Sequence, residues 1–405
     1  MNLFIANVGS TSLKFKLFEF PSESILAEGR IEAIGRDRSP ASYKNCRGET
    51  RRRDEAIANY PDAIRMAVGW VTDPEVGVLE SLARIDAVGF KTVHARNLSG
   101  AVRLDEAALH CMRDFAGVAP LHNPIYLTAI GFFQDVLPGV PLYGLFETTF
   151  HQTIPPEAHS YAIPKAWREE LGVRRYGFHG ASHWYISERV PSLLGRSAEG
   201  LRIISCHLGG SSSLCAIRDG RSVDTTMGFS PQSGVPQSAR NGELDPFVVL
   251  YMIESQGWTA ERVRKALCEA SGLKGLSGGL SGDIPPLQEA AAKGNADAQL
   301  ALDCFVYEVA KHVGALWVAC GGCDVLVFTG GIGERGVAIR SRVCERLACL
   351  GVKIDAEANA KASGEATIST DDSAARVMIV PTNEEIIVAR RIAETIGSEE
   401  RIEQG

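Results

Sequence analysis

The chain has no excess of basic residues and no long hydrophobic run. Its 42 lysines and arginines are outnumbered by 49 aspartates and glutamates, which gives a net charge of −7. This balance argues against nucleic acid or an anionic membrane as a partner, because both attract basic surfaces. No apolar stretch approaches the ~18 residues of a membrane-spanning helix. The first residues also lack the basic and long apolar segments of a signal peptide, so we expect a cytoplasmic protein.

The ten cysteines form no repeated metal-binding or disulfide pattern. Cys320 and Cys323 make a Cys-x-x-Cys motif, a spacing used in redox and metal sites. No second pair or histidine cluster lies near it in the sequence, and the intervening Gly-Gly indicates a helix that ends before a strand. Cysteines within apolar runs are predicted to be reduced, buried thiols. These are Cys206, Cys215, Cys304, Cys344 and Cys349.

The chain also lacks the G-x-x-x-x-G-K-[ST] signature of a P-loop, but it contains a different glycine turn twice. Residues 9–13 read Gly-Ser-Thr-Ser-Leu and residues 210–214 read Gly-Ser-Ser-Ser-Leu, 201 positions apart. Each turn follows an apolar strand and precedes a second strand, which predicts two hairpins. One such turn is often only a tight hairpin. Two of them, with backbone N–H groups and hydroxyls exposed, indicate duplicated halves that grip a polyphosphate.

Predicted strands alternate with predicted helices along the chain, which indicates an α/β fold. A chain of 405 residues suits two domains. Asn123 and Pro124 are typical of an N-cap and a first helical residue. A long helix over 295–318 is expected to bury one apolar face. The residues of that face are Leu300, Phe305, Val309 and Val313.

A third glycine-rich segment complicates this interpretation. Gly331-x-Gly333-x-x-Gly336 follows an apolar strand, and Asp355 ends the next apolar stretch. This spacing matches a dinucleotide-binding fingerprint and favours an NAD-dependent dehydrogenase. Too few βαβ units follow to complete such a domain, however. The same turn also suits the ribose and α-phosphate of a nucleotide, so both interpretations stay open at this point.

A set of polar residues suggests phosphoryl transfer. His179, His183 and Arg240 are possible cations for developing negative charge, and the Glu384 carboxylate is a candidate Mg²⁺ ligand. Each of them alone is more often a structural residue. Together they supply the cations and the carboxylate that phosphoryl transfer requires.

Nine segments together resemble the acetate kinase family, within the actin, Hsp70 and sugar-kinase fold superfamily. They are NVGSTSLKF, APLHNP, FHQTIP, RYGFHGASH, CHLGG, GRSVDTTMGFSP, NGELDP, VFTGGIGER and PTNEE, in family order. The resemblance implies an α/β fold of two duplicated actin-like (ribonuclease H-like) ATPase domains with the active site in the cleft between them. The N-terminal domain would comprise 1–150 plus 382–405, and the nucleotide-binding domain 151–381.

The resemblance also implies the reaction. The family transfers the γ-phosphoryl group of ATP to a short-chain carboxylate, giving acyl phosphate and ADP, reversibly. Acetate is the expected substrate and propionate the next. Mg²⁺, or alternatively Mn²⁺, would assist, and the protein would be a cytoplasmic homodimer whose partners are the small carboxylate and the nucleotide.

The family's site residues carry over position by position. The catalytic set would be Glu147, His179 and Arg240. Asn7 and Glu384 would hold the metal. The carboxylate pocket would comprise Lys91, Val93, Leu121, Phe178 and Pro231. The nucleotide would meet Ser10, Ser12, Lys14, His207, Leu208, Gly209, Gly210, Ser211, Asp283, Gly331, Ile332, Gly333, Glu334 and Arg335.

Four positions depart from the family pattern. Lys91 replaces an arginine, Glu147 an aspartate, Gly210-Ser211 an Asn-Gly pair and Pro285 an arginine. Lysine is a mobile point charge, whereas arginine grips an oxyanion with a planar fork. The longer Glu147 is hypothesised to restore contact with a repositioned Lys91. The lost nucleotide contacts leave two alternatives, namely a pyrophosphate-dependent variant or a nucleotide- or acyl-phosphate-binding homologue without turnover.

Overall fold

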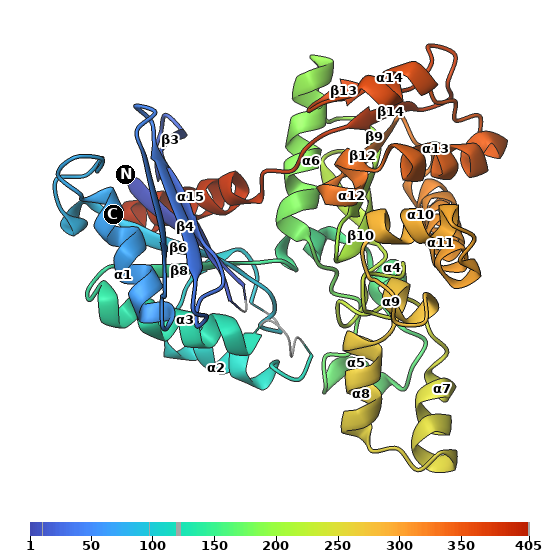
Figure 1. The fold of residues 1–405 in the computed structure, drawn as a ribbon, viewed down its shortest axis with the longest axis horizontal. Helices are drawn as coiled ribbons and strands as arrows, with labels where there is room; N and C mark the ends of the chain where they lie inside the picture. The colour runs from blue at the N-terminus through green and yellow to red at the C-terminus, as the bar shows by residue number, and fades with distance from the viewer. Residues whose placement is uncertain (10, 97, 119–122, 404–405) are drawn as a thin grey trace. The chain divides into compact units, whose positions relative to one another are not determined.

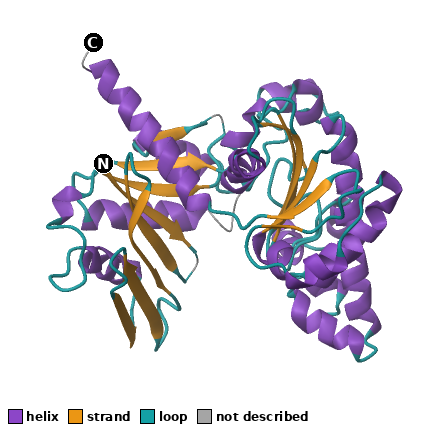
Figure 2. Cartoon of the chain, turned by 90° about the horizontal axis from the view of Figure 1, so that it is seen from above, coloured by secondary structure: helices purple, strands orange, loops and turns teal. Residues whose placement is uncertain are grey.

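The computed structural model describes residues 1–9, 11–96, 98–118 and 123–403. The chain divides into two compact units (Figure 1). Unit 1 comprises Met1–Thr149 and Asn383–Gly405, and unit 2 comprises Phe150–Thr382. Each unit contains one sheet flanked by helices (Figure 2). Within the described residues, no helix is both long enough and apolar enough to span a membrane.

The unit 1 sheet has eight strands in the order β5-β4-β3-β2-β1-β6-β8-β7. β1 runs antiparallel to β2 and parallel to β6, and β6 runs parallel to β8. The run LFIA makes β1 apolar enough to be covered on both faces, whereas β2 alternates buried and exposed residues as predicted. The strands are β1 Asn2–Val8, β2 Leu13–Glu19, β3 Ser24–Ile31, β4 Ser39–Asn45, β5 Thr50–Glu55, β6 Ala87–Thr92, β7 Ala101–Arg103 and β8 Leu142–Phe146.

Among the described residues, three α-helices pack on this sheet, and α2 packs on α3. α1 and α3 contact each other and strands β1–β3, while α15 contacts β1, β6, β7 and β8. The predicted N-cap at Asn123 is wrong. α3 begins at Asn123, and its buried amide donates to the carbonyls of His94 (2.8 Å) and Met112 (2.9 Å) instead. The helices are α1 Tyr60–Val71, α2 Glu106–Asp114, α3 Asn123–Val136 and α15 Glu384–Glu403, with a 3₁₀ turn at Leu82–Arg84.

The unit 2 sheet repeats this topology. Its six strands lie in the order β11-β10-β9-β12-β14-β13, with the same relative directions as β3-β2-β1-β6-β8-β7 in unit 1. Asp219 and Gly220 join β10 to β11 with positive φ angles of 54° and 74°, as a tight hairpin requires. The fold is therefore a duplicated α/β fold. The strands are β9 Arg202–Leu208, β10 Ser212–Arg218, β11 Arg221–Thr225, β12 Val325–Thr329, β13 Ala366–Thr367 and β14 Arg376–Ile379.

Side chains that alternate along these strands belong to two separate hydrophobic cores. One core packs against α11, the other against α6. The helical elements of this unit include α6 and α11, and the first of them, the 3₁₀ helix η2, begins at Thr149 of unit 1. They are η2 Thr149–Thr153, α4 Pro156–His159, α5 Lys165–Glu169, α6 Gly180–Leu194, α7 Pro246–Leu250, η3 Tyr251–Ser255, α8 Ala260–Glu269, α9 Gly272–Leu276, α10 Ile284–Ala292, α11 Ala296–Cys320, α12 Gly330–Arg335, α13 Val337–Arg346, η4 Leu347–Leu350 and α14 Ala356–Lys361.

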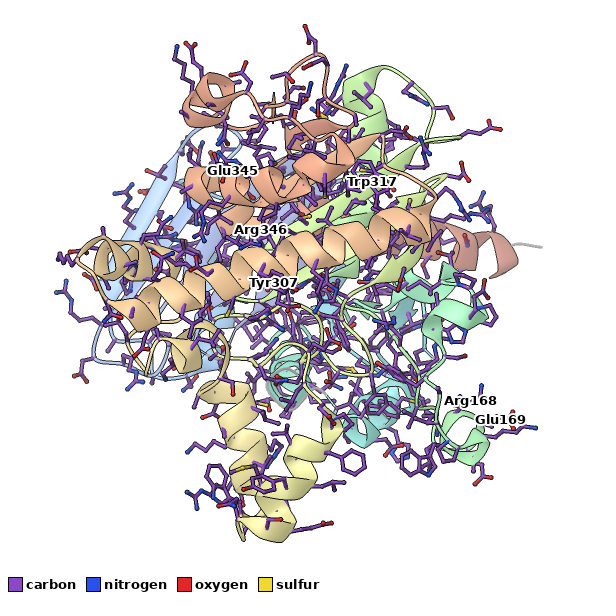
Figure 3. The ribbon with its side chains drawn as sticks, turned by 90° about the vertical axis from the view of Figure 1, so that its right-hand side faces the viewer. Arg168, Glu169, Tyr307, Trp317, Glu345 and Arg346 are labelled. Carbon is purple, nitrogen blue, oxygen red and sulfur yellow. The ribbon has the colours of Figure 1, made fainter. Side chains whose placement is uncertain are left out.

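The long helix α11 crosses unit 2, as the sequence pattern predicts (Figure 3). Phe305, Val309 and Val313 are buried, but Leu300 is 49% exposed. The prediction for Leu300 is wrong because five residues of α-helix place it about 140° around the axis from Phe305. Arg346 of α13 lies 5.5 Å from the ring centroid of Tyr307 on the outer side of α11.

All ten cysteines are free thiols. Cys206, Cys215 and Cys344 are buried as predicted, Cys304 is half-buried, and Cys349 is exposed, so the prediction for Cys349 is wrong. The Cys-x-x-Cys pair lies where the sequence suggests, at the end of α11 and before β12. Gly321 adopts a left-handed φ of 74° there and caps the helix.

Candidate active site

Three charged side chains meet at one edge of the unit 1 sheet. Lys91 lies near the end of β6, Glu147 directly follows the parallel strand β8, and Glu384 is the first residue of α15. The Lys91 Nζ is 3.1 Å from a Glu147 carboxylate oxygen and is also hydrogen-bonded to the Glu384 carboxylate. Parallel strands end at the same edge, which explains why residues far apart in sequence converge. The predicted Lys91–Glu147 contact is present.

This cluster is shielded from water. The side chains of Lys91, Glu147 and Glu384 are 20%, 5% and 13% exposed. Burial lowers the pKa of Lys91, but Glu384 and Glu147 outweigh that effect and hold the pKa well above its ordinary value. Burial raises the pKa of the adjacent Tyr126 to about 12. Two carboxylates around one ammonium leave one net negative charge, which favours a cation.

The first glycine turn begins beside this cluster. Ala6 pairs with Phe90, so Asn7 and Lys91 are the next residues along adjacent strands, and Asn7 also pairs with the exposed Lys14 of β2. Gly9 N–H donates to the Ser12 carbonyl (2.9 Å), which closes the turn. The Tyr60 hydroxyl donates to the Gly9 carbonyl from α1. Val93 is buried just after β6. Ser10 and Leu121 lie outside the described residues.

Unit 2 contains a chain of histidines and serines. The Ser213 hydroxyl lies 2.8 Å from Nδ1 of His179 and 2.9 Å from Nε2 of His183. Ser205 holds the other nitrogen of His183 at 2.9 Å. His179 stacks on His207 with ring centroids 4.3 Å apart. Burial, followed by the charges of neighbouring histidines, depresses the pKa of His183 well below its ordinary value, so this ring is neutral.

Sequence reasoning missed Ser205 and Ser213. It also listed His183 as a possible cation, and that prediction is wrong because the buried ring is neutral. The alternation of strand side chains carries a usable signal. His207 of β9 pairs with Ser213 of β10, and Ser205 lies two residues before His207, hence on the same face. His179 adopts a left-handed φ of 56° as it enters α6. This conformation is rare outside glycine and marks a constrained position.

The second glycine turn is joined to Arg240. Arg240 Nη1 donates to the Ser211 hydroxyl (3.2 Å) and to the side-chain oxygen of Gln237 (3.3 Å). The Ser211 hydroxyl donates to that same oxygen at 2.7 Å. The buried Gln237 amide also donates to the Pro231 carbonyl, so it ties three predicted site residues together.

The backbone of this turn is suited to an anion. Gly209 N–H donates to the Ser212 hydroxyl (3.1 Å). The N–H groups of Gly210 and Ser211 donate to no acceptor within the part of the chain that the structure describes. Uncovered N–H groups beside a guanidinium can bind a phosphate oxygen. The replacement of Asn-Gly therefore leaves a turn that retains anion-binding groups.

The other predicted nucleotide residues lie in one helix and at the N-cap of another. Gly331, Ile332, Gly333, Glu334 and Arg335 lie in the short helix α12 rather than in an open turn. Gly330 permits this arrangement, because a Cβ atom there would lie 2.7 Å from the Leu208 carbonyl oxygen. Asp283 is exposed at the start of α10. Phe178 is buried just before α6.

The dinucleotide fingerprint is wrong. Asp355 does not end a parallel strand; it caps α14 and accepts from the N–H groups of Glu357 and Ala358. The strand parallel to β12 on that side is β14, which lies further along the chain. The spacing of the glycines and Asp355 matches the motif, but among the described residues Asp355 does not end the parallel strand that the motif requires.

Repeated α/β sheets, glycine turns and clustered cations and carboxylates define a duplicated α/β phosphotransferase. The chain belongs to the acetokinase family, whose model matches residues 2–390. It is 40% identical over 403 residues to the acetate kinase of Methanosarcina acetivorans, with 99% of this chain and 98% of that protein covered. It is 40% identical over 398 residues to the acetate kinase of Natranaerobius thermophilus, with 98% and 100% covered.

Solved structures agree with this membership. The Porphyromonas gingivalis acetate kinase matches with a TM-score of 0.84 at 35% identity, and the match covers 96% of this chain and 98% of that one. A propionate kinase from Francisella tularensis matches with a TM-score of 0.87 at 32% identity and the same coverage.

Proposed function

We propose that the chain transfers the γ-phosphoryl group of ATP to acetate or propionate, giving acyl phosphate and ADP, reversibly. The observation that carries this proposal is the contact between Arg240 and Ser211. It puts a guanidinium beside a glycine turn whose N–H groups are uncovered. Full-length membership of the acetokinase family supports the same reaction. We further propose that the protein is a cytoplasmic homodimer and that units 1 and 2 are its two catalytic domains.

The chemistry requires charge neutralisation more than covalent catalysis. A carboxylate that attacks a phosphate brings two anions together, so positioned cations lower the barrier. Arg240 would stabilise the transferring group, and His179, oriented by Ser213, would assist it. Lys14, Ser12 and residues 207–211, 283 and 331–335 are the proposed nucleotide contacts.

Unit 1 fits a divalent cation. The Asn7 amide and the Glu384 carboxylate offer oxygen ligands, which Mg²⁺ and Mn²⁺ prefer, and the cluster around Lys91 carries an excess negative charge. When bound, Mg²⁺ would neutralise phosphate charge. Lys91 would compete with a bound metal for Glu384, because the Lys91 and Glu384 side chains are hydrogen-bonded to each other.

The proposed carboxylate contacts combine one cation with apolar side chains. Lys91 would attract the carboxylate, with Glu147 holding its ammonium in position. Val93, Phe178 and Pro231 are buried and would meet the alkyl group. Such contacts discriminate modestly, since one methylene is worth about 1–3 kcal/mol. Acetate and propionate are therefore both expected substrates.

Acyl phosphate trapped as its hydroxamate gives a direct test. The purified protein is supplied with acetate, propionate or butyrate, and with ATP or pyrophosphate in the presence of Mg²⁺. We expect hydroxamate with ATP and the two shorter acids. Activity with pyrophosphate but not with ATP would identify pyrophosphate as the phosphoryl donor. If no combination of acid and donor gives hydroxamate, the protein binds nucleotide or acyl phosphate without turnover.

Two variants test the assigned roles. His179→Ala and Arg240→Ala should each reduce the turnover strongly while the protein stays folded. Arg168→Ala is the matched control, because Arg168 lies on the exposed helix α5 (Figure 3). Unchanged turnover in Arg240→Ala would mean that its role is misassigned.

A further inference from the structure

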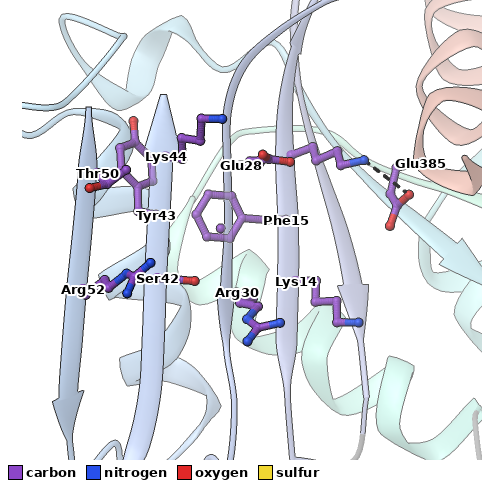
Figure 4. Close-up of a pocket in the computed structure, with 12 residues that line it drawn as sticks. Lys14, Phe15, Glu28, Arg30, Ser42, Tyr43, Lys44, Thr50, Arg52 and Glu385 are labelled. Atoms are coloured by element: carbon purple, nitrogen blue, oxygen red, sulfur yellow. Dashed lines mark ion pairs between the residues drawn. The ribbon is translucent and has the colours of Figure 1, made fainter. Parts of the chain in front are cut away.

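A channel crosses one face of strands β2–β5 in unit 1. Two rows of side chains, each formed by residues paired across the strands, border it (Figure 4). Because the rows are two residues apart along each strand, they are separated by about 7 Å. The channel has a volume of about 420 Å³. Row A comprises Lys14, Arg30, Ser42 and Arg52, and row B comprises Lys16, Glu28, Lys44 and Thr50.

The lining is strongly basic in a chain whose net charge is −7. Five basic side chains line the channel against two acidic ones, Glu28 and Glu385. Lys16 is 3.7 Å from Glu385, and Arg30 is 3.7 Å from Glu32. The three other cations form no ion pair with any residue that the structure describes. They are Lys14, Lys44 and Arg52.

Strand β5 shows that this imbalance is confined to one face. Arg51 and Arg53, whose side chains alternate with that of Arg52, are both paired with acids. Arg51 contacts Asp73 and Glu75, and Arg53 contacts Glu55. The strand therefore neutralises its cations on one face and leaves Arg52 available on the channel face.

The shape of the channel restricts the ligand. Adjacent strands are about 4.8 Å apart, so a ligand that reaches from Lys14 on β2 to Arg52 on β5 spans about 14 Å. The floor lies over Phe15 and Tyr43, which are both only 2% exposed and offer no ring for base stacking. Cations along both sides, including guanidinium forks, suit a narrow chain of phosphate groups.

We propose that this channel binds linear inorganic polyphosphate. Binding requires no step of the carboxylate kinase reaction. Lys14 is the one channel residue that is also a proposed nucleotide contact, so the variants that test the channel leave it unchanged. A longer chain should bind more tightly than tripolyphosphate, because it contacts the cations of all four strands together.

Equilibrium titration of the full-length protein tests this proposal. The ligands are long-chain sodium polyphosphate, tripolyphosphate, poly-glutamate and single-stranded DNA, all without ATP. We expect long-chain polyphosphate to bind most tightly, and we expect its affinity to fall as the salt concentration rises. The double variant Lys44→Gln/Arg52→Gln should weaken its binding by about tenfold or more. Lys44→Arg/Arg52→Lys should retain most of it.

Arg53→Gln is the matched control, because it removes one charge from β5 without touching the alternate face. It should change the affinity by less than about twofold. All three variants should keep the wild-type rate of acyl phosphate formation, which shows that they are folded. Equal polyphosphate binding by the double variant and the wild type would overturn the proposal. Absence of binding, or binding of poly-glutamate or DNA as tight as that of polyphosphate, would also overturn it.

Discussion

At the residue scale, the ammonium of Lys91 depends on the length of the Glu147 side chain. The 3.1 Å contact uses the additional methylene that glutamate has over aspartate. Glu147→Asp should lower kcat/KM by about tenfold, because one charge-assisted hydrogen bond is lengthened. Steady-state kinetics with acetate measures this, and Glu169→Asp on the exposed helix α5 is the control.

The double variant Lys91→Arg/Glu147→Asp should regain activity relative to Glu147→Asp alone, because the fork of arginine reaches the shorter carboxylate. Higher activity in Glu147→Asp than in the wild type would refute the hypothesis of paired adjustment.

Ser213 gives a second residue-scale prediction. Ser213→Ala removes the hydroxyl that contacts both His179 and His183, whereas Ser205→Ala removes a contact of His183 alone. Ser213→Ala should therefore reduce kcat more than Ser205→Ala does, with comparable losses of stability of about 1–3 kcal/mol. Kinetics and urea denaturation separate the two effects. Equal kcat values in the two variants would show that Ser213 does not position His179.

Single residues were predictable where the family resemblance or a local pattern determines them. The pairing of Lys91 with Glu147 followed from two substitutions in one predicted site. The hydrogen bonds of Asn123 did not follow, because its partners His94 and Met112 are brought to it by the tertiary fold. The serine partners of the histidines depend likewise on the register of β9 with β10.

At the scale of elements, the two glycine turns are less alike than their sequences. The first loop has four residues, 9–12, between β1 and β2, and the second has three, 209–211, between β9 and β10. The sequence repeat aligns Gly9 with Gly210, whereas Gly209 is the first residue of the second loop. A backbone hydrogen bond closes the first turn, and the Ser212 hydroxyl closes the second. The sequence repeat did not reveal this difference in loop length, because the matching residues 210–214 extend past the loop into β10.

Helix α11 offers a stability test at this scale. Phe305→Ala should destabilise the protein by about 3–5 kcal/mol, because it leaves a cavity in the core against the sheet. Leu300→Ala on the exposed side of the same helix should cost less than about 0.5 kcal/mol. Chemical denaturation followed by circular dichroism gives both values. Similar losses in the two variants would contradict the assigned orientation of α11.

At the scale of the whole molecule, buried histidines predict sensitivity to acid. Burial lowers the pKa of His94 to about 3 and that of His151 to about 4, and it also depresses the pKa of His183 well below its ordinary value. The unfolded chain takes up protons below about pH 6.5 and the folded chain does not. The free energy of unfolding should therefore be highest above that pH and should fall as the pH drops towards 4.

Each histidine contributes up to about 1.4 kcal/mol per pH unit over this range. Urea denaturation at about pH 7.5, 6 and 5 measures the slope. His151→Gln should make the slope shallower, since one depressed group is removed. A free energy of unfolding that is constant from pH 7.5 to 5 would show that these histidines titrate in the folded protein.

The duplicated architecture was largely predictable, because alternating strands and helices and a repeated turn appear directly in the sequence. The dinucleotide fingerprint misled because a spacing of glycines and an acid does not specify the strand that must carry the acid. Asp355 caps a helix instead. The whole-chain resemblance succeeded where the single motif failed, since nine segments in order constrain the topology far more than one does.

Transfer of the γ-phosphoryl group from ATP to a carboxylate can be followed through the fate of the γ-phosphate. The protein is given acetate, Mg²⁺ and ATP labelled with radioactive phosphorus in the γ position. We predict that the label appears in a hydroxylamine-sensitive acyl phosphate and that this product disappears in Arg240→Ala. Label found only in inorganic phosphate, or retained entirely in ATP, would show that the protein does not transfer the γ-phosphoryl group to acetate.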